Sequence, residues 1–215
     1  MLTDAQSIKV VKYLLGKKSV TQAEIAKETG VSLSYINELT KKMHDANIVS
    51  KPHYKGLVLT DQHKLFIGVS LEHPLVYVRR YKMKGDKESI ERSITKAFRR
   101  KVDYAFTLLS ATNNYGLDVE GGQISIYVSD KPEELKKAYE AIEDIGGSRD
   151  DEYGRIEIYP ANEGVLYDKK ESNGAFFVSR EQLILDLFNH SSLSYIGSEL
   201  LKRSQPKVIK SEAKK

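Results

Sequence analysis

The first quarter of the chain carries helix start and stop signals at closely fixed spacings. Thr21 and Glu24 form a capping box, in which each side chain bonds the other residue's backbone N–H, so a helix begins here. Gly30 ends that helix, because a left-handed backbone costs glycine little. Ser32 is then expected to cap a second helix, which Asn47 ends in a left-handed turn. The sequence therefore predicts two short helices joined by a tight turn.

Segments on both sides extend this pattern to three helices and a hairpin. Apolar residues recur at helical spacing over residues 4–16, which predicts an amphipathic helix before the pair. After the pair, residues 48–49 and 57–59 are apolar and enclose the polar tip 51–56, as in two short strands. This order is typical of a winged helix-turn-helix, and its spacing resembles that of many winged-helix regulators over the first third of the chain. The alternative is a small helical domain that binds protein.

The second helix of the pair has the side chains that DNA recognition needs. Ile36, Leu39 and Met43 give it an apolar rear, and its other side is polar and basic. The major groove of DNA admits one helix, whose N-terminal residues approach the base edges. Asparagine can bond adenine bidentately, and glutamate can accept a hydrogen bond from cytosine. Base contacts are therefore predicted for Leu33, Ser34, Asn37 and Glu38.

Phosphate contacts are predicted around this helix. Helix N-termini attract anions through free backbone N–H groups, and lysines neutralise phosphate charge. Two alternatives stay open: Lys41 and Lys42 can form an ordinary solvated face, and Tyr35 can pack on the first helix. The whole predicted DNA-binding set is Thr21, Gln22, Ser32, Leu33, Ser34, Tyr35, Asn37, Glu38, Lys41, Lys42, Lys51, His53, Tyr54 and Lys55.

Charge is distributed unevenly along the chain, whose net charge is +4. Residues 79–101 contain ten basic and three acidic residues, whereas residues 102–204 contain ten basic and nineteen acidic residues. A basic first half suggests that only one part of the protein meets a polyanion. The basic stretch 79–101 could extend the DNA contact and add affinity without sequence choice. Alternatively, it packs against the acidic half of the same chain.

The remainder of the chain alternates strands and helices. Strands are expected at 75–78, 122–130, 155–160 and 164–169, and helices at 90–98, 132–145, 179–190 and 194–204. Ser179 and Gln182 have the spacing of a second capping box. The expected fold class is therefore α/β or α+β. The predicted domains are a winged helix-turn-helix at 1–68, a mixed α/β domain at 69–205 and a flexible basic tail at 206–215.

Several kinds of chemistry lack the residues they need. There is no cysteine, so disulfides, thiolate metal sites and thiol nucleophiles are excluded. The five histidines do not stand at metal-ligand spacing, and no P-loop, dinucleotide-binding loop or nucleophile elbow occurs. We therefore predict no catalytic residue, no metal and no cofactor. No apolar run approaches the length that spans a membrane, so the expected location is the cytoplasm.

The second half of the chain resembles a known family. The segments LLSATNNYGLD and GRIEIYPANEGVLYD precede VSREQLILDL, and the leucine pair Leu200-Leu201 follows. This order is similar to the C-terminal domain of the abortive-infection, type IV antitoxin family, whose members join it to an N-terminal winged helix. The resemblance implies a repressor of its own operon and a neighbouring nucleotidyltransferase-like toxin as partner. It also implies a C-terminal domain similar to a degenerate nucleotidyltransferase fold.

Nucleotidyltransferase activity itself is not expected. Such an enzyme needs a Gly-Ser pair followed by spaced acidic metal ligands. Residues 109–112 lack the pair, and the strand after them offers only Asp130. Gln182 and Asp186, one helical turn apart, are interpreted as an internal polar pair.

We therefore predict a sequence-specific regulator that binds double-stranded DNA as a homodimer or cooperatively. Two alternatives remain. One is a nucleotidyltransferase-fold enzyme that is tethered to DNA, and the other is an interaction module that binds a partner toxin.

Overall fold

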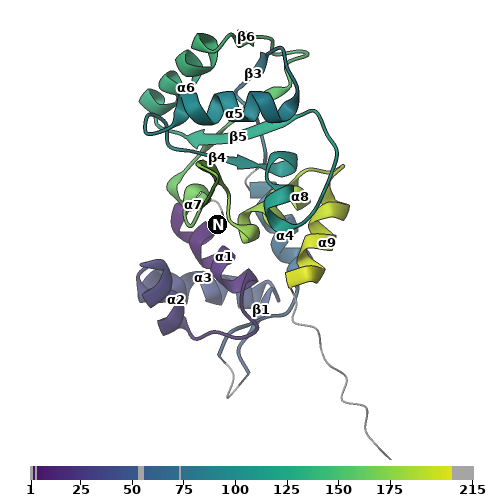
Figure 1. Cartoon of the computed structure of the whole chain (residues 1–215). Coiled ribbons are helices and arrows are strands. Elements are labelled where there is room, and N and C mark those ends of the chain that lie inside the picture. Colours follow the sequence, from purple (N-terminus) through teal and green to yellow (C-terminus); the bar gives the residue numbers. More distant parts are fainter. Residues whose placement is uncertain (1, 3, 53–55, 73, 205–215) are drawn as a thin grey trace, which may run out of the picture.

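Three helices and a hairpin form the N-terminal part of the structure, in the predicted order (Figure 1). The structure is a computed structural model that describes residue 2 and residues 4–52, 56–72 and 74–204. Val49 pairs with Leu59 in antiparallel register, and Val20 forms a bridge to Leu57. The prediction of a winged helix-turn-helix is confirmed. Its elements are α1 (Ala5–Leu15), α2 (Gln22–Thr29), α3 (Leu33–Asp45), β1 (Val49–Ser50) and β2 (Val58–Leu59).

The predicted start and stop signals act as expected. Glu24 N donates to Thr21 Oγ1 at 3.1 Å and Thr21 N donates to Glu24 Oε2 at 2.6 Å, which completes the capping box. Ser32 Oγ accepts from the backbone N–H of the residue three places on, at the start of α3. Gly30 and Asn47 both adopt positive φ, of 70° and 55°. Local sequence therefore fixes both ends of the helix-turn-helix.

Helix α4 (Gln62–Glu72) connects the hairpin to the rest of the chain. It runs through the boundary predicted after residue 68, so the two portions are joined by a continuous helix. The first strand beyond it begins later than predicted, since residues 74–78 have no regular secondary structure and β3 occupies Arg79–Lys82. The prediction of a strand at 75–78 is wrong, because pairing with the neighbouring strand starts at Arg79 and the preceding valines are exposed.

A seven-stranded mixed sheet forms the second part, which confirms the mixed α/β class. Its order is β6-β3-β7-β5-β4-β9-β8, with parallel pairing of β5 with β7 and of β4 with β9. The remaining neighbours pair antiparallel. The strands after β3 are β4 (Tyr104–Thr107), β5 (Ile124–Ser129), β6 (Ser148–Arg149), β7 (Ile156–Ala161), β8 (Lys170–Ser172) and β9 (Ala175–Phe177).

The two faces of this sheet are covered by different elements (Figure 1). Helices α5 (Lys87–Phe98) and α6 (Pro132–Asp144) pack on one face through a separate apolar cluster. The other face meets α7 (Glu163–Leu166), α8 (Arg180–Asn189) and the winged helix, and α9 (Ser194–Ser204) packs beside α8. The chain thus places α5 and α6 at the opposite end of the molecule from α2 and α3 (Figure 1).

Two sequence predictions in this part need correction, and one hairpin was missed. Residues 164–169 are not a strand, because Asn162 Oδ1 accepts from two backbone N–H groups and starts the short helix α7. The β8–β9 hairpin was not predicted, although its turn residues Asn173 and Gly174 both adopt the positive φ of such turns. The second capping box is half formed: Ser179 accepts from Gln182 N, but the Gln182 side chain bonds Asp186 instead.

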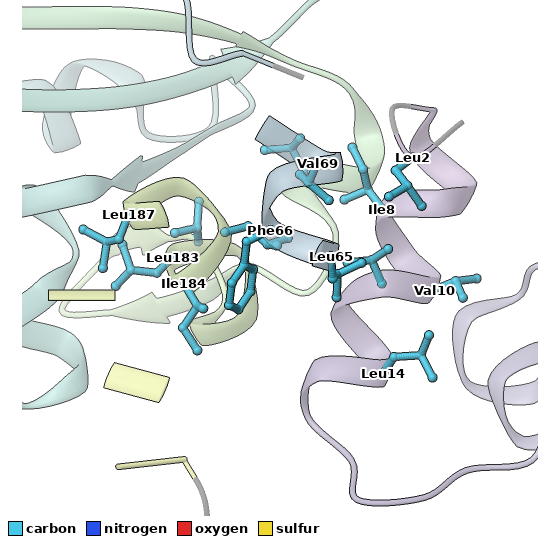
Figure 2. Close-up of a cluster of buried hydrophobic side chains, with 14 of the residues drawn as sticks. Leu2, Ile8, Val10, Leu14, Leu65, Phe66, Val69, Leu183, Ile184 and Leu187 are labelled. Carbon is cyan, nitrogen blue, oxygen red and sulfur yellow. The ribbon is translucent and has the colours of Figure 1, made fainter. Parts of the chain in front are cut away.

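One apolar core joins the winged helix to the sheet domain (Figure 2). Figure 2 shows side chains of α4, among them Leu65 and Phe66, between those of α1 and α8. Phe66 also stacks on Phe188, with ring centroids 4.1 Å apart. Because these side chains are buried, turning the winged helix away from α8 would expose the shared core. The orientation of α3 is therefore fixed relative to the sheet.

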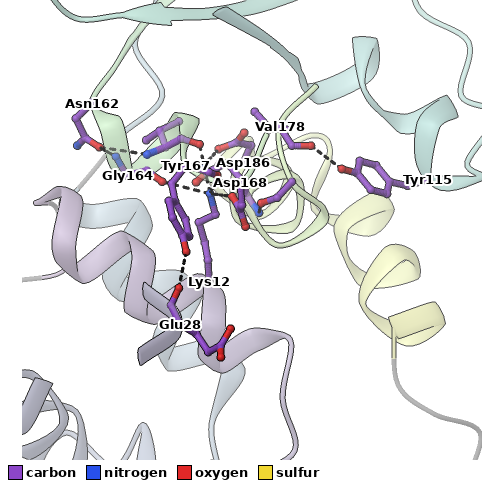
Figure 3. A network of polar contacts seen from close by, with 12 residues as sticks. Lys12, Glu28, Tyr115, Asn162, Gly164, Tyr167, Asp168, Val178 and Asp186 are labelled. Carbon is purple, nitrogen blue, oxygen red and sulfur yellow. Dashed lines mark hydrogen bonds and ion pairs between the residues drawn. The ribbon is translucent and has the colours of Figure 1, made fainter. Parts of the chain in front are cut away.

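A buried lysine adds a polar connection to the same junction (Figure 3). Lys12 of α1 has a side chain that is 1% exposed, and its Nζ lies 2.6 Å from Asp168 Oδ1. The Nζ also donates to the carbonyl oxygens of Tyr167 at 2.7 Å and Gly164 at 3.2 Å. Burial lowers the pKa of Lys12, and the Asp168 carboxylate opposes that shift. Tyr167 OH in turn donates to Glu28 O of α2 at 2.9 Å, so two helices of the winged helix are held.

Asp186 forms a second buried polar group under the sheet. Its carboxylate accepts from Thr107 Oγ1, from Tyr127 OH at 2.9 Å and from Gln182 Nε2 at 2.8 Å. Burial raises the pKa of Asp186 to about 6, and the three hydrogen bonds limit the rise. The interpretation of Gln182 and Asp186 as an internal polar pair agrees with this geometry.

Replacing Lys12 by methionine should destabilise the junction. Lys12→Met leaves buried carbonyl oxygens and Asp168 without their cation, so we expect a loss of about 2–4 kcal/mol in the free energy of unfolding. Lys9→Met is the matched control, because Lys9 pairs with Glu163, whose side chain is 75% exposed. That pair should be worth about 1 kcal/mol or less. Urea unfolding measures both, and equal losses would contradict the role of Lys12.

Stability should also depend on pH through Asp186. The pKa of an aspartate in the unfolded chain is about 3.9, which is lower than that of Asp186 in the folded protein. The folded state therefore binds this proton more tightly, and the resulting stabilisation is complete below a pH of about 3.9. This stabilisation is lost as pH rises from about 4 through about 6, by an amount on the order of 3 kcal/mol. Asp186→Asn cannot titrate. The unfolding free energy of Asp186→Asn relative to the unchanged protein should therefore rise between pH 4 and pH 7, and a flat difference would contradict the assignment.

Candidate nucleic-acid interface

Helix α3 is buried on one side and open on the other. Ile36 and Met43 are fully buried and Leu39 is 3% exposed, whereas Leu33 at the N-terminal end is 49% exposed. An apolar side chain that is half exposed beside polar neighbours suits contact with a thymine methyl group. The outer surface of α3 lies at the end of the molecule that carries the hairpin (Figure 1).

One stripe along this outer surface borders a hollow. Asn37, Lys41 and His44 follow one another at helical spacing and line a depression of about 290 Å³ with Gln22 and Lys51. The Gln22 amide is held in place, since its Nε2 donates to the Thr40 hydroxyl at 2.6 Å. The hollow therefore brings together the start of α2, the outer surface of α3 and the base of the hairpin. It combines amide groups, which can read base edges, with cations, which suit phosphate.

The neighbouring stripe is partly paired within the chain. Lys42 Nζ lies 2.6 Å from Glu38 Oε1, and both side chains are exposed. The hydrogen bond from Lys42 lowers the pKa of Glu38. Ser34 is exposed on the same side. Lys41 forms no ion pair with any residue that the structure describes, so its cation is better placed than that of Lys42 to meet a phosphate.

Tyr35 takes the alternative position that the sequence left open. Its hydroxyl donates to Asp4 Oδ2 at 2.6 Å, and the side chain is half-buried against α1. Burial and the Asp4 carboxylate raise the pKa of Tyr35 to about 12. The same carboxylate accepts from Gln6 N and Ser7 N at the start of α1. The geometry favours a structural role for Tyr35, which holds α3 against α1.

The two helix N-termini differ in what they offer to an anion. At α2, both the N–H and the hydroxyl of Thr21 donate to Glu24 Oε2, so a carboxylate already occupies this end. These hydrogen bonds lower the pKa of Glu24. At α3, Ser32 caps the helix and no acidic residue lies in the first turn. The start of α3 is therefore the better phosphate site of the two.

The hairpin is placed by its contact with Val20. Val20 N donates to Leu57 O at 3.0 Å, and Leu57 N donates to Val20 O at 2.7 Å. Lys51 at the base of the hairpin is exposed and borders the hollow. The predicted tip residues His53, Tyr54 and Lys55 lie outside the described residues.

Three bordering residues, Thr40, His44 and Leu57, were missed by the sequence prediction. His44 lies one turn after Lys41 on the same stripe, and the helical period alone could have identified it. Leu57 borders the hollow from the hairpin, and its neighbourhood depends on the bridge to Val20. A contact between residues so far apart in sequence leaves no local pattern.

The basic stretch 79–101 is not continuous with this surface. Arg80 is ion-paired with the buried Glu157 of β7, and the Arg79 guanidinium lies 3.8 Å from the centre of the Tyr139 ring. Both arginines thus contribute to the sheet domain. Helix α5 lies across the sheet from the winged helix (Figure 1). For these two arginines, the structure therefore favours the alternative that the basic stretch packs within the chain and does not extend the DNA contact.

The described part of the chain also bears on two other features, a metal site and a membrane-spanning helix. No group of three or more His, Cys, Asp or Glu side chains there could hold a metal ion. In the same residues, no helix has the length and apolar character needed to cross a bilayer.

Gly56→Ala should disrupt the hairpin. Gly56 has φ of 68°, and a Cβ atom there would lie 2.7 Å from Val20 O. Gly30→Ala is the matched control, since Gly30 has φ of 70° but nothing within 4 Å of an added Cβ. We expect a loss of about 1–2 kcal/mol for Gly30→Ala from the left-handed backbone alone, and a larger loss for Gly56→Ala. Thermal unfolding compares them, and equal losses would mean that the close approach to Val20 is unimportant.

Comparison with known proteins agrees with this geometry. Residues 3–50 match the family model described as winged helix-turn-helix DNA-binding. No curated protein and no solved structure gave a significant match. The matched residues contain α1, α2, α3 and β1, which build most of the hollow. The N-terminus of the chain is a winged helix-turn-helix DNA-binding domain.

Proposed function

We propose that the protein is a sequence-specific regulator of transcription that inserts α3 into the major groove of duplex DNA. The observation that carries this proposal is the hollow in which Asn37 and Lys41 of α3 lie beside Lys51 of the hairpin. Leu33, Ser34, Asn37 and Glu38 would face bases, and Lys41, Lys42 and Lys51 would face phosphates. A DNA-binding domain acts where the chromosome is, so the proposed location is the cytoplasm.

We further propose a role as an autorepressor of the antitoxin type. The resemblance of residues 108–204 to the abortive-infection, type IV antitoxin family supports this role, as does the attachment of a mixed α/β domain to the winged helix. A nucleotidyltransferase-like toxin is the proposed partner, and co-purification with the product of the neighbouring gene tests it. Footprinting on the DNA upstream of the protein's own gene tests autorepression.

We propose that the protein acts by binding and not by catalysis. Asp130, the acid that a nucleotidyltransferase mechanism would need at its strand end, is exposed, and its N–H donates to Ala161 O. Residues 109–112, where the enzyme's Gly-Ser pair would be expected, lie in two short 3₁₀ turns. Transfer of label from a nucleotide to any acceptor, lost on Asp130→Ala, would support the enzyme alternative instead.

Two substitutions on α3 distinguish recognition of bases from electrostatic attraction to phosphates. Asn37→Ala should weaken binding to the footprinted site by about 1–3 kcal/mol and leave binding to random duplex unchanged, since a base contact is lost. Lys41→Gln should weaken both duplexes alike and reduce the slope of log affinity against log salt by about one, because one phosphate contact is lost. Fluorescence anisotropy at several salt concentrations measures both effects.

The control is Lys136→Gln, which removes the same charge from α6 at the far end of the molecule. Lys136 is exposed and pairs weakly with Glu140, so its loss should change neither affinity nor salt slope. An equal loss on specific and random DNA for Asn37→Ala would contradict base reading by α3. An unchanged salt slope for Lys41→Gln would contradict its contact with phosphate.

A further inference from the structure

A cleft opens on the face of the sheet that α5 and α6 cover. The β8–β9 hairpin lies at one edge of the sheet, and residues of this hairpin and of α5 line a cavity of about 550 Å³. Phe106, Ala175 and Phe177 line it from the strands, and the rings of Phe106 and Phe177 have centroids 5.6 Å apart. Cavities that bind small molecules have this size and a largely apolar lining. The cleft lies across the sheet from the residues proposed to meet DNA.

Cations stand along one edge of this cleft. Arg92, Lys96 and Arg99 recur at helical spacing on the side of α5 that lines the cleft, and all three are exposed. Arg92 is 3.9 Å from Glu88. Neither Lys96 nor Arg99 forms an ion pair with a residue that the structure describes. Two cations without acidic partners beside an apolar floor favour a ligand that carries negative charge.

A buried acceptor lies on the same side of α5. Glu91 also lines the cleft, and its Oε1 is buried with no hydrogen-bond partner among the described residues. The ammonium group of Lys87 forms an ion pair with Glu91 Oε1 at 4.0 Å and donates a hydrogen bond to Leu109 O at 2.9 Å. Glu91 therefore has a cationic partner within the chain, which leaves Lys96 and Arg99 as the cations available to a ligand.

We propose that this cleft binds an aromatic anion. Its ring would lie against Phe177, since Phe106 is 1% exposed, and its acidic group would face Lys96 and Arg99. Aromatic contact and partly desolvated charge pairing both favour such a molecule. This site does not depend on the proposed binding of DNA, and its test is separate.

A pair of fluorescent probes tests the charge and the ring separately. 8-Anilinonaphthalene-1-sulfonate is an aromatic anion, and N-phenyl-1-naphthylamine is the same molecule without the sulfonate. The sulfonate probe should bind the full-length protein at one saturable site, at least about fivefold more tightly than the neutral probe. Lys96→Glu and Arg99→Glu should each weaken the sulfonate probe by about five- to tenfold and leave the neutral probe unchanged.

Two further variants locate the binding. Lys136→Glu makes the same charge change on α6, outside the cleft, and should alter neither probe. Ser172→Trp places an indole at the hairpin edge of the cleft and should reduce binding of both probes, with an unchanged circular dichroism spectrum as the check on folding. Retained binding of the sulfonate probe by Ser172→Trp would place the probe elsewhere and overturn the proposal.

Other outcomes would also overturn it. Absence of saturable binding, or equal affinity for the two probes, would show that the cleft does not select an aromatic anion. If Lys136→Glu weakened binding of the sulfonate probe as much as Lys96→Glu and Arg99→Glu do, the effect would come from the overall charge of the protein and not from the cleft. If Lys96→Glu and Arg99→Glu weakened duplex DNA binding but not the sulfonate probe, these cations would belong to a nucleic-acid surface.

Discussion

The packing of α1 and α4 against α8 determines where the outer surface of α3, which we propose meets DNA, points. Phe66 stacks on Phe188, and Lys12 is buried among carbonyl oxygens of α7 and of Tyr167 directly after it. Apolar burial and a satisfied buried charge act on the same junction. Turning the winged helix would therefore expose the core and also leave the Lys12 ammonium without its partners. The α3 surface is thus presented by a rigid body that includes the sheet.

As a result of this arrangement, the two faces of the sheet are covered by different elements. One face is closed by the winged helix, and the buried Asp186 carboxylate there accepts hydrogen bonds from Thr107 and Tyr127 of the strands. The other face is closed by α5 and α6, and the cleft lies between α5 and the β8–β9 hairpin at one edge of the sheet. The uneven charge of the chain has a related explanation, since Arg80 of the basic stretch pairs with Glu157 of the acidic half.

Local signals were enough to predict the winged helix from the sequence. The capping box at Thr21 and the left-handed turns at Gly30 and Asn47 involve neighbouring residues, so the sequence displays them directly. Short apolar runs were ambiguous, and residues 75–78 and 164–169 were both wrongly predicted as strands. The helical period indicated that Asn37 and Lys41 share one side of α3, and both border the hollow. It could not place Tyr35, whose partner Asp4 lies 31 residues away in sequence.

If α3 meets DNA as proposed, Glu38 shows how its outer surface could discriminate between sequences. Glu38 and Lys42 pair at the surface, where such a pair is worth about 1 kcal/mol or less and exchanges readily. A cytosine amino group near Glu38 would free Lys42 for a phosphate, whereas a base that offers only acceptors would leave the carboxylate unpaired against the duplex. Asn37 and Lys41, one stripe away, have no such competitor among the described residues. Recognition would then combine attraction along one stripe with rejection along the other, which is how specificity usually arises.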